Sequence, residues 1–273
     1  MPIFVGGMFK SGTSLTRKYL GNHPKIFAGL ETNWFQLDDY FKKEISNISD
    51  IVAMWNSFYS IDESDIYKII DFSNSSEEVL DKMMFHIKSR NNFIDWCDKS
   101  PPNISYGKRI IDYWKDSKII HVIRDPLDIF GSLKQAKKWN SPKEFVERWS
   151  LIFSKVEYLR KKKNYIEIYY EDLILNTEIT LKKIYEFCNL GWKNDYAKHE
   201  PDKWEYKIVK KMTGKDSTTL KRLSKPITKN RIGIGEKILN QNEIEEITFL
   251  IKEKDLLDEF EPFEFSFNLF WEE

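Results

Sequence analysis

A glycine-rich run near the start of the chain holds the first residues with a recognisable chemistry. It reads Gly6-Gly7-Met8-Phe9-Lys10-Ser11-Gly12-Thr13-Ser14 and joins a short apolar segment to a helical one. Such a turn directs backbone N–H groups and a helix N-terminus toward an anion. Its glycines have the G-x-x-x-x-G spacing of a phosphate loop. We therefore expect the loop to bind a phosphate group through Lys10, Ser11, Gly12, Thr13 and Ser14.

The position of the lysine separates this loop from that of nucleotide triphosphatases. Those proteins place Lys and Ser/Thr directly after the second glycine, where they bind phosphates and Mg²⁺. Here Thr13 and Ser14 occupy these places, and Lys10 lies inside the loop, where it can contact a 5′-phosphate and its leaving-group oxygen. A P-loop kinase or nucleotide triphosphatase with Asp98 as Mg²⁺ ligand stays open as an alternative, which Mg²⁺-dependent ATP binding would favour.

A second anion-binding pattern follows the most apolar segment of the chain, Lys118–Ile123. Arg124 comes directly after this segment, Asp125 caps the next helix, and Ser132 lies two turns into it. Open α/β sheets bind ligands beyond the C-terminal ends of their strands. A guanidinium group beside a hydroxyl suits a phosphate monoester. A structural salt bridge from Arg124 to Asp125 or Asp128 is the alternative for this motif.

Short apolar segments alternate with helical ones along the chain. The apolar segments, read as buried strands, are 3–5, 93–97, 118–123 and 166–170. Clear helical segments are 13–20, 177–188 and 242–254. Residues 34–92 read as several helices packed over one end of the sheet. We expect one α/β domain over residues 1–273, with a P-loop-like three-layer fold and a central parallel sheet flanked by helices.

Composition narrows the function classes. The 273 residues include 43 basic and 43 acidic ones, and a net charge of zero argues against a nucleic-acid or anionic-membrane binder. Two cysteines and four scattered histidines give neither a disulfide framework nor a metal site. No apolar run approaches the roughly 18–20 residues that span a bilayer, and no signal segment precedes the first strand. We expect a cytoplasmic protein that needs no metal.

Two segments of the chain resemble the nucleotide motifs of sulfotransferases that use 3′-phosphoadenosine 5′-phosphosulfate (PAPS). Residues 4–31 (FVGGMFKSGTSLTRKYLGNHPKIFAGLE) are similar to the 5′-phosphosulfate loop, most closely that of the tyrosylprotein and carbohydrate branch. That branch usually has Arg in the loop, whereas Lys10 is the choice of the cytosolic branch. Residues 118–134 (KIIHVIRDPLDIFGSLK) resemble the 3′-phosphate motif, with Arg124 and Ser132 in the two binding places.

Later segments extend the resemblance with weaker patterns. Residues 169–173 (YYEDL) resemble a family element whose tyrosine, here Tyr170, lies near the nucleotide. Thr218 and Arg231 lie where the family supplies further hydroxyl and basic contacts, although its basic-Gly-x-x-Gly pattern is absent. The resemblance thus implies a PAPS site, with PAP as the product, completed by the C-terminal part of the chain.

The resemblance also implies catalytic roles. Glu31 matches the family's base position and would take the proton of the acceptor hydroxyl, Lys99 would stabilise sulfuryl oxygens, and Lys10 the departing oxygen. The transfer would be in line and would require no metal. A non-catalytic protein that binds PAP on the same fold stays open as a second alternative. For Arg17 on the first helix we expect a solvent-exposed side chain, and a side chain that reaches the site stays open as the alternative.

The acceptor is a hydroxyl compound whose identity the sequence leaves open between a sugar, a small alcohol or phenol, a lipid head group and a tyrosine. Asn33 stands where the tyrosylprotein branch has Arg, which favours a small molecule or saccharide over a protein. Residues 34–92 are expected to line the acceptor side. The aromatic-rich segment Phe260–Trp271 is read as a final strand, a packing tail or the surface of a homodimer.

Overall fold

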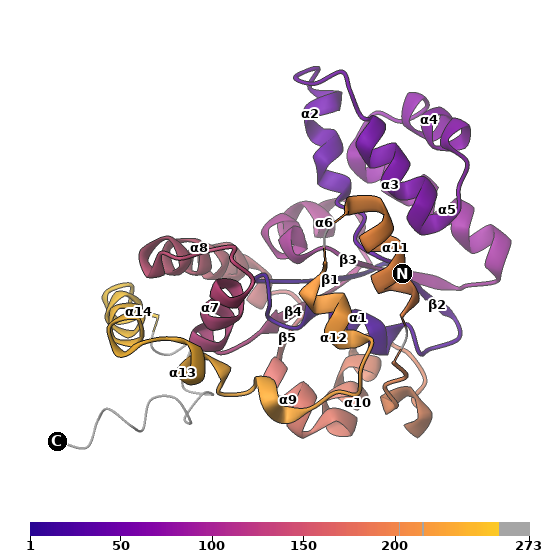
Figure 1. Cartoon of the computed structure of the whole chain (residues 1–273). Coiled ribbons are helices and arrows are strands. Elements are labelled where there is room, and N and C mark those ends of the chain that lie inside the picture. The colour runs from indigo at the N-terminus through magenta and orange to yellow at the C-terminus, as the bar shows by residue number, and fades with distance from the viewer. Residues whose placement is uncertain (202, 215, 257–273) are drawn as a thin grey trace.

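The computed structural model describes residues 1–201, 203–214 and 216–256 (Figure 1). The segment Phe260–Trp271, with its three interpretations, lies outside these residues. None of the helices in the described ranges has both the length and the apolar character needed to cross a bilayer.

Five parallel strands form the central sheet. In spatial order they are β2 (Ile26–Ala28), β3 (Asp95–Lys99), β1 (Ile3–Gly7), β4 (Lys118–Ile123) and β5 (Tyr165–Tyr169). The predicted α/β fold with a parallel sheet is confirmed. Strand β2 was not predicted, because three residues are too few to give a periodic pattern.

The predicted strand 93–97 is shifted by two residues. Pairing with β2 begins at Asp95, opposite Ile26, and Ile94 before it is exposed. The strand therefore extends to Lys99, which is its last residue and not part of the loop after it.

Side chains of the sheet alternate between two apolar clusters, one on each face. Phe4 and Ile119 belong to the cluster that is completed by helices α3 to α8 and α14. Ile3 and Ile120 belong to the cluster completed by helices α1, α9, α10 and α12. Because neighbouring residues enter opposite cores, the fold has three layers, helices–sheet–helices, as Figure 1 shows.

The helices fall into groups along the chain. Those of the N-terminal half are α1 (Thr13–Leu20), α2 (Asp38–Phe41), α3 (Ser49–Tyr59), α4 (Glu63–Asp71), α5 (Ser76–Asn91) and α6 (Gly107–Tyr113). Then follow α7 (Pro126–Gln135), α8 (Pro142–Arg160), α9 (Tyr170–Leu175) and α10 (Thr177–Phe187). The last are α11 (Trp204–Thr213), α12 (Thr218–Leu223), α13 (Ile234–Ile238) and α14 (Gln241–Glu253). The chain also forms short 3₁₀ helices: η1 (Trp34–Leu37), η2 (Pro101–Tyr106), η3 (Asn194–Ala197) and η4 (Lys229–Arg231).

Helix α13 is fixed to α7 by a carboxylate and a very close backbone approach. Asp128 on α7 accepts hydrogen bonds from the backbone N–H groups of Gly233 at 3.1 Å and Gly235 at 2.7 Å. A Cβ atom at Gly235 would lie 2.4 Å from the carbonyl carbon of Leu127. This docking brings η4, just before α13, to the C-terminal edge of the sheet.

Candidate functional site

A cavity of about 810 Å³ lies at the C-terminal ends of the strands. Its lining includes nearly all the residues that the sequence predicted, from segments far apart in the chain: Lys10, Gly12, Thr13, Ser14, Glu31, Lys99, Arg124, Ser132, Tyr170, Thr218 and Arg231. Ser11 is the exception, because its side chain is fully buried and its N–H donates to Met8 O at 3.1 Å. The structure therefore does not bring the Ser11 hydroxyl to the cavity wall.

The glycine-rich loop takes a left-handed course between β1 and α1. Lys10 has a φ of 74° and Gly12 a φ of 108°. A Cβ atom at Gly12 would also lie 2.5 Å from the ring of Tyr170, so the ring can approach only a glycine. The Lys10 ammonium group donates to the hydroxyls of Thr218 and Thr219, each at 3.0 Å. The lysine therefore points into the cavity toward the start of α12.

Arg124 joins the second predicted anion site to the loop. Its Nη1 donates to the backbone carbonyl of Lys10 at 3.0 Å, and its guanidinium group lies 4.4 Å from the ring centre of Tyr170. It also pairs with Asp128 at 3.1 Å, so the salt bridge considered as the structural alternative is present as well. The two sites are thus adjacent and face one cavity.

Arg231 completes this end of the cavity from η4. Its Nη2 donates to the hydroxyl of Ser132 at 2.7 Å, and its backbone carbonyl accepts from Arg124. Arg222 on α12, which sequence reasoning missed, lies beside it, and both guanidinium groups donate to the side chain of Gln135. A lone arginine on a short helix carries no motif, and nothing in the sequence near Arg222 marks it.

The electrostatics of this end are those of an anion site. Burial, followed by the nearby charges of Lys138, Arg222, Arg231 and Arg124, lowers the pKa of Lys10 to about 8. Burial and two neighbouring arginines also lower the pKa of Arg231 to about 10. The Nε atoms of Arg124 and Arg231 are buried and have no hydrogen-bond partner among the described residues. Cations in such a group repel one another, and a bound dianion relieves the repulsion.

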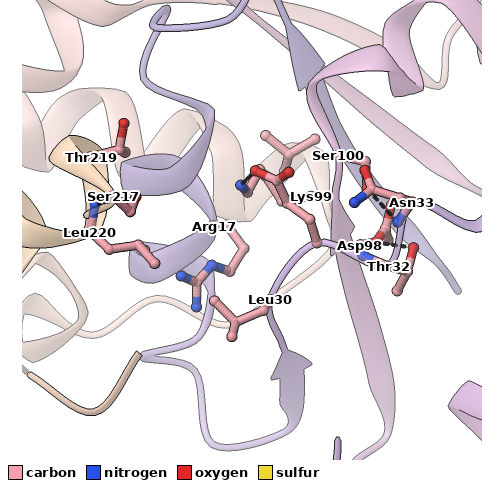
Figure 2. Close-up of polar contacts among 12 residues, drawn as sticks. Arg17, Leu30, Thr32, Asn33, Asp98, Lys99, Ser100, Ser217, Thr219 and Leu220 are labelled. Carbon is pink, nitrogen blue, oxygen red and sulfur yellow. Dashed lines mark hydrogen bonds and ion pairs between the residues drawn. The ribbon is translucent and has the colours of Figure 1, made fainter. Parts of the chain in front are cut away.

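Glu31 and Lys99 lie together at the other end of the cavity. The Lys99 ammonium group, which is almost fully buried, forms an ion pair with the more exposed carboxylate of Glu31. The loop that carries Glu31 is fixed to β3, because Asp98 accepts a hydrogen bond of 2.7 Å from the Thr32 hydroxyl (Figure 2). Asp98 also accepts from the side chain of Asn103 at 2.7 Å. A carboxylate and an ammonium group are thus held together in the wall of the cavity.

The same contacts weigh against the kinase alternative. Asp98 is fully buried, does not line the cavity, and uses both oxygens for hydrogen bonds within the core. It is therefore not placed to be the Mg²⁺ ligand that this alternative requires. Among the residues described, no three His, Cys, Asp or Glu side chains gather as metal ligands.

The expectation of a solvent-exposed Arg17 was wrong, and Arg17 lines the cavity, in agreement with the alternative. This side chain is 3% exposed and forms two hydrogen bonds of 2.6 Å with the carboxylate of Glu205 on α11. The partners are 188 residues apart in the sequence, so helix periodicity at Arg17 could not reveal the pair.

A central parallel sheet with a glycine-rich loop after its first strand defines a P-loop-like α/β protein. A family model described as "Sulfotransferase family" matches residues 2–194. This match covers more than half of the sequence, and the chain therefore belongs to the Sulfotransferase family.

Curated relatives are similar at low identity. The chain is 24% identical over 211 residues to the protein-tyrosine sulfotransferase of Drosophila melanogaster, a match that covers 72% of this chain and 40% of that protein. It is 22% identical over 212 residues to protein-tyrosine sulfotransferase A of Caenorhabditis elegans, covering 72% and 52%. The chain thus spans about half the length of these relatives, or less.

Solved structures share the fold. The sulfotransferase domain of the Synechococcus PCC 7002 olefin synthase has a TM-score of 0.58 at 16% identity, over 87% of this chain and 94% of that domain. Mouse sulfotransferase SULT7A1, solved in complex with PAP, has a TM-score of 0.54 at 14% identity, over 97% and 88%. At such identities the likeness establishes the common fold.

Proposed function

We propose that this chain transfers a sulfuryl group from PAPS to an acceptor hydroxyl. The observation that carries the proposal is the single cavity that Lys10 and Arg124 line together, joined by the hydrogen bond from Arg124 to the Lys10 carbonyl. A bisphosphorylated nucleotide needs two cationic sites at a fixed separation, and family membership supplies the chemistry. The buried guanidinium nitrogens without partners fit a phosphate in this place.

Each residue has a role in the proposed reaction. Lys10 and the N-terminus of α1 bind the 5′-phosphate and stabilise the oxygen that leaves with PAP. Arg124, Ser132 and Arg231 bind the 3′-phosphate. The acceptor oxygen forms the new bond to sulfur as the bond to the 5′-phosphate oxygen breaks, and Glu31 takes the hydroxyl proton.

Lys99 has a double role at the acceptor end. Its ammonium group lies against Glu31, which orients the carboxylate, and it faces the cavity where sulfuryl oxygens would pass. A fixed cation at that point stabilises negative charge in the transition state without reorganisation.

The acceptor end of the cavity has mainly apolar walls. Leu30, Met54, Phe58 and Val209 line it. These side chains favour a hydroxyl on a small molecule with an apolar body over a saccharide, which would need more hydrogen-bonding partners. Helix α3 contributes two of them, in line with the expectation that residues 34–92 form the acceptor side.

A tyrosine in a protein is the second candidate acceptor. The relatives from Drosophila melanogaster and Caenorhabditis elegans carry the name protein-tyrosine sulfotransferase, and a tyrosine ring also suits apolar walls. A panel of radiolabelled transfer reactions separates the candidates: simple phenols and aliphatic alcohols, monosaccharides, and acidic tyrosine peptides. Transfer to phenols or alcohols alone supports the small-molecule acceptor, whereas transfer to peptides alone contradicts it.

Calorimetric titration with PAP tests the nucleotide site directly. We expect Lys10→Ala and Arg124→Ala each to weaken binding about 10- to 100-fold, because each removes a charge-assisted contact to a phosphate. Lys182→Ala serves as a control, since Lys182 lies in an exposed ion pair on α10. Wild-type affinity in both site variants would refute the assignment. Tight PAP binding without transfer to any acceptor would instead favour the non-catalytic alternative.

Two further expectations from the sequence stay predictions. Cell fractionation tests the cytoplasmic location, and sedimentation analysis tests the homodimer.

A further inference from the structure

Helix α11 lies over the acceptor end of the cavity. It packs against α3 and α12, as Figure 1 shows, and Val209 and Thr213 on it line the cavity. None of its residues is fully buried. Glu205 precedes Val209 by four residues, so these side chains share one face of the helix. That face points toward the cavity and toward α1.

Glu205 connects this face to the interior of the protein. Its two carboxylate oxygens accept from Nη2 and Nη1 of Arg17, each at 2.6 Å. The side chains are 13% and 4% exposed, and Arg17 also donates to the carbonyl of Ala28 at 3.1 Å. Burial opposes ionisation of Glu205, but the hydrogen bonds from Arg17 lower its pKa below the ordinary value. A two-bond ion pair of this kind holds the carboxylate in one orientation.

Arg17 belongs to the helix that begins at the phosphate loop. Helix α11 is also attached to the segment that follows it, because Lys210 and the Tyr206 hydroxyl contact Asp216, each at 2.9 Å. Shortly after, Thr218 accepts from Lys10. Helix α11 is therefore connected to the loop and its helix on both sides, once through a buried ion pair and once through the hydroxyls that contact Lys10.

We propose that the Arg17–Glu205 ion pair is a positioning pair that fixes α11 as a cover over the acceptor end of the cavity. Helix α11 has no fully buried side chain and its ion pair with Asp216 is half exposed, so the buried Arg17–Glu205 pair is the stronger of its two charged attachments. Loss of the carboxylate also leaves Arg17 buried without its counter-charge, which drives the two elements apart. That this end of the cavity receives the acceptor rests on the proposed function, whereas the attachment of α11 by the ion pair does not depend on it.

The reactivity of a cysteine placed in the cavity wall reports how well α11 shields the cavity, and the measurement needs no nucleotide. The chain's two cysteines, Cys97 and Cys188, are buried, so a thiol at Met54 on α3 gives the signal. In Met54→Cys we expect slow reaction with an aromatic disulfide reagent. Adding Glu205→Gln should accelerate it about tenfold or more, as expected for local opening. Glu205→Asp, which keeps the charge, should recover part of the slow rate.

Hydrogen exchange locates the change and supplies the control. In Glu205→Gln we expect about tenfold faster exchange over 204–213, with α10 unchanged and PAP affinity within about twofold of the wild type. Glu178→Gln, which removes an exposed ion pair on α10, should leave α11 as in the wild type.

Equal thiol reactivity with and without Glu205→Gln would overturn the inference, as would faster exchange throughout the molecule. If the wild-type protein does not bind PAP, the proposed function is refuted, but the hydrogen-exchange result for α11 still holds.

Discussion

Lys10 combines two properties that single it out among the basic residues. It lies inside the glycine-rich loop, and its pKa is lowered to about 8, mainly by burial and then by four neighbouring cations. The Lys10 ammonium group therefore loses its proton at a pH only slightly above neutral. A nucleotide phosphate next to it would favour the charged form.

The affinity for PAP should depend on pH through Lys10. Below about pH 8 the ammonium group is already protonated and binds the phosphate directly. Above that pH binding must be accompanied by proton uptake, so we expect affinity to fall by up to about tenfold per pH unit. Calorimetry in buffers of different ionisation enthalpy measures the uptake. Lys10→Arg, which stays charged, should flatten the profile, and a flat wild-type profile would contradict the assignment.

Glu31 is the residue on which the proposed chemistry, as distinct from binding, depends. We expect Glu31→Gln to lower the rate of transfer about 10²- to 10⁴-fold, since an amide cannot take the hydroxyl proton. PAP affinity should stay at the wild-type value because Glu31 lies at the opposite end of the cavity. Single-turnover transfer of labelled sulfate measures the effect, with Glu157→Gln on α8 as the exposed control. Undiminished transfer would exclude Glu31 as the base.

At the scale of elements, the sequence predicted what is local. The loop between β1 and α1 could be read because its glycines, lysine and hydroxyls are contiguous, and the helix at 13–20 was correct. Strand β2 is too short for periodicity to detect. The Arg17–Glu205 pair and the approach of Arg222 depend on tertiary packing, which no local pattern encodes.

The contact between α7 and α13 gives a prediction for α13, a helix that contributes no residue to the cavity lining. Gly235→Ala would place a methyl group against the Leu127 carbonyl, and the backbone cannot yield cheaply there. We expect a loss of about 1–3 kcal/mol in stability, typical of overpacking, and weaker PAP binding as Arg231 withdraws from Ser132. Thermal unfolding and titration measure both. Gly191→Ala, with open space around it, is the matched control, and identical behaviour of the two variants would contradict the argument.

For the whole molecule, the neutral net charge conceals a strong local field. The 43 basic and 43 acidic residues cancel in total, yet Lys10, Arg124, Arg222 and Arg231 gather at one edge of the sheet. Three of these four cations, Lys10, Arg124 and Arg231, were identified from the sequence. The three-layer arrangement was also predictable, because buried parallel strands separated by helices permit few other folds.

The part of the chain that is recognisable as a sulfotransferase stops at residue 194, yet Thr218, Arg222 and Arg231 all come later. A recombinant fragment trimmed to the recognised boundary would keep every strand of the sheet. It would lose the hydroxyls that Lys10 contacts and two of the gathered guanidinium groups. Such a fragment would keep the sheet but lose α12 and α14 from its two apolar clusters, together with part of the charge that a twice-phosphorylated nucleotide requires.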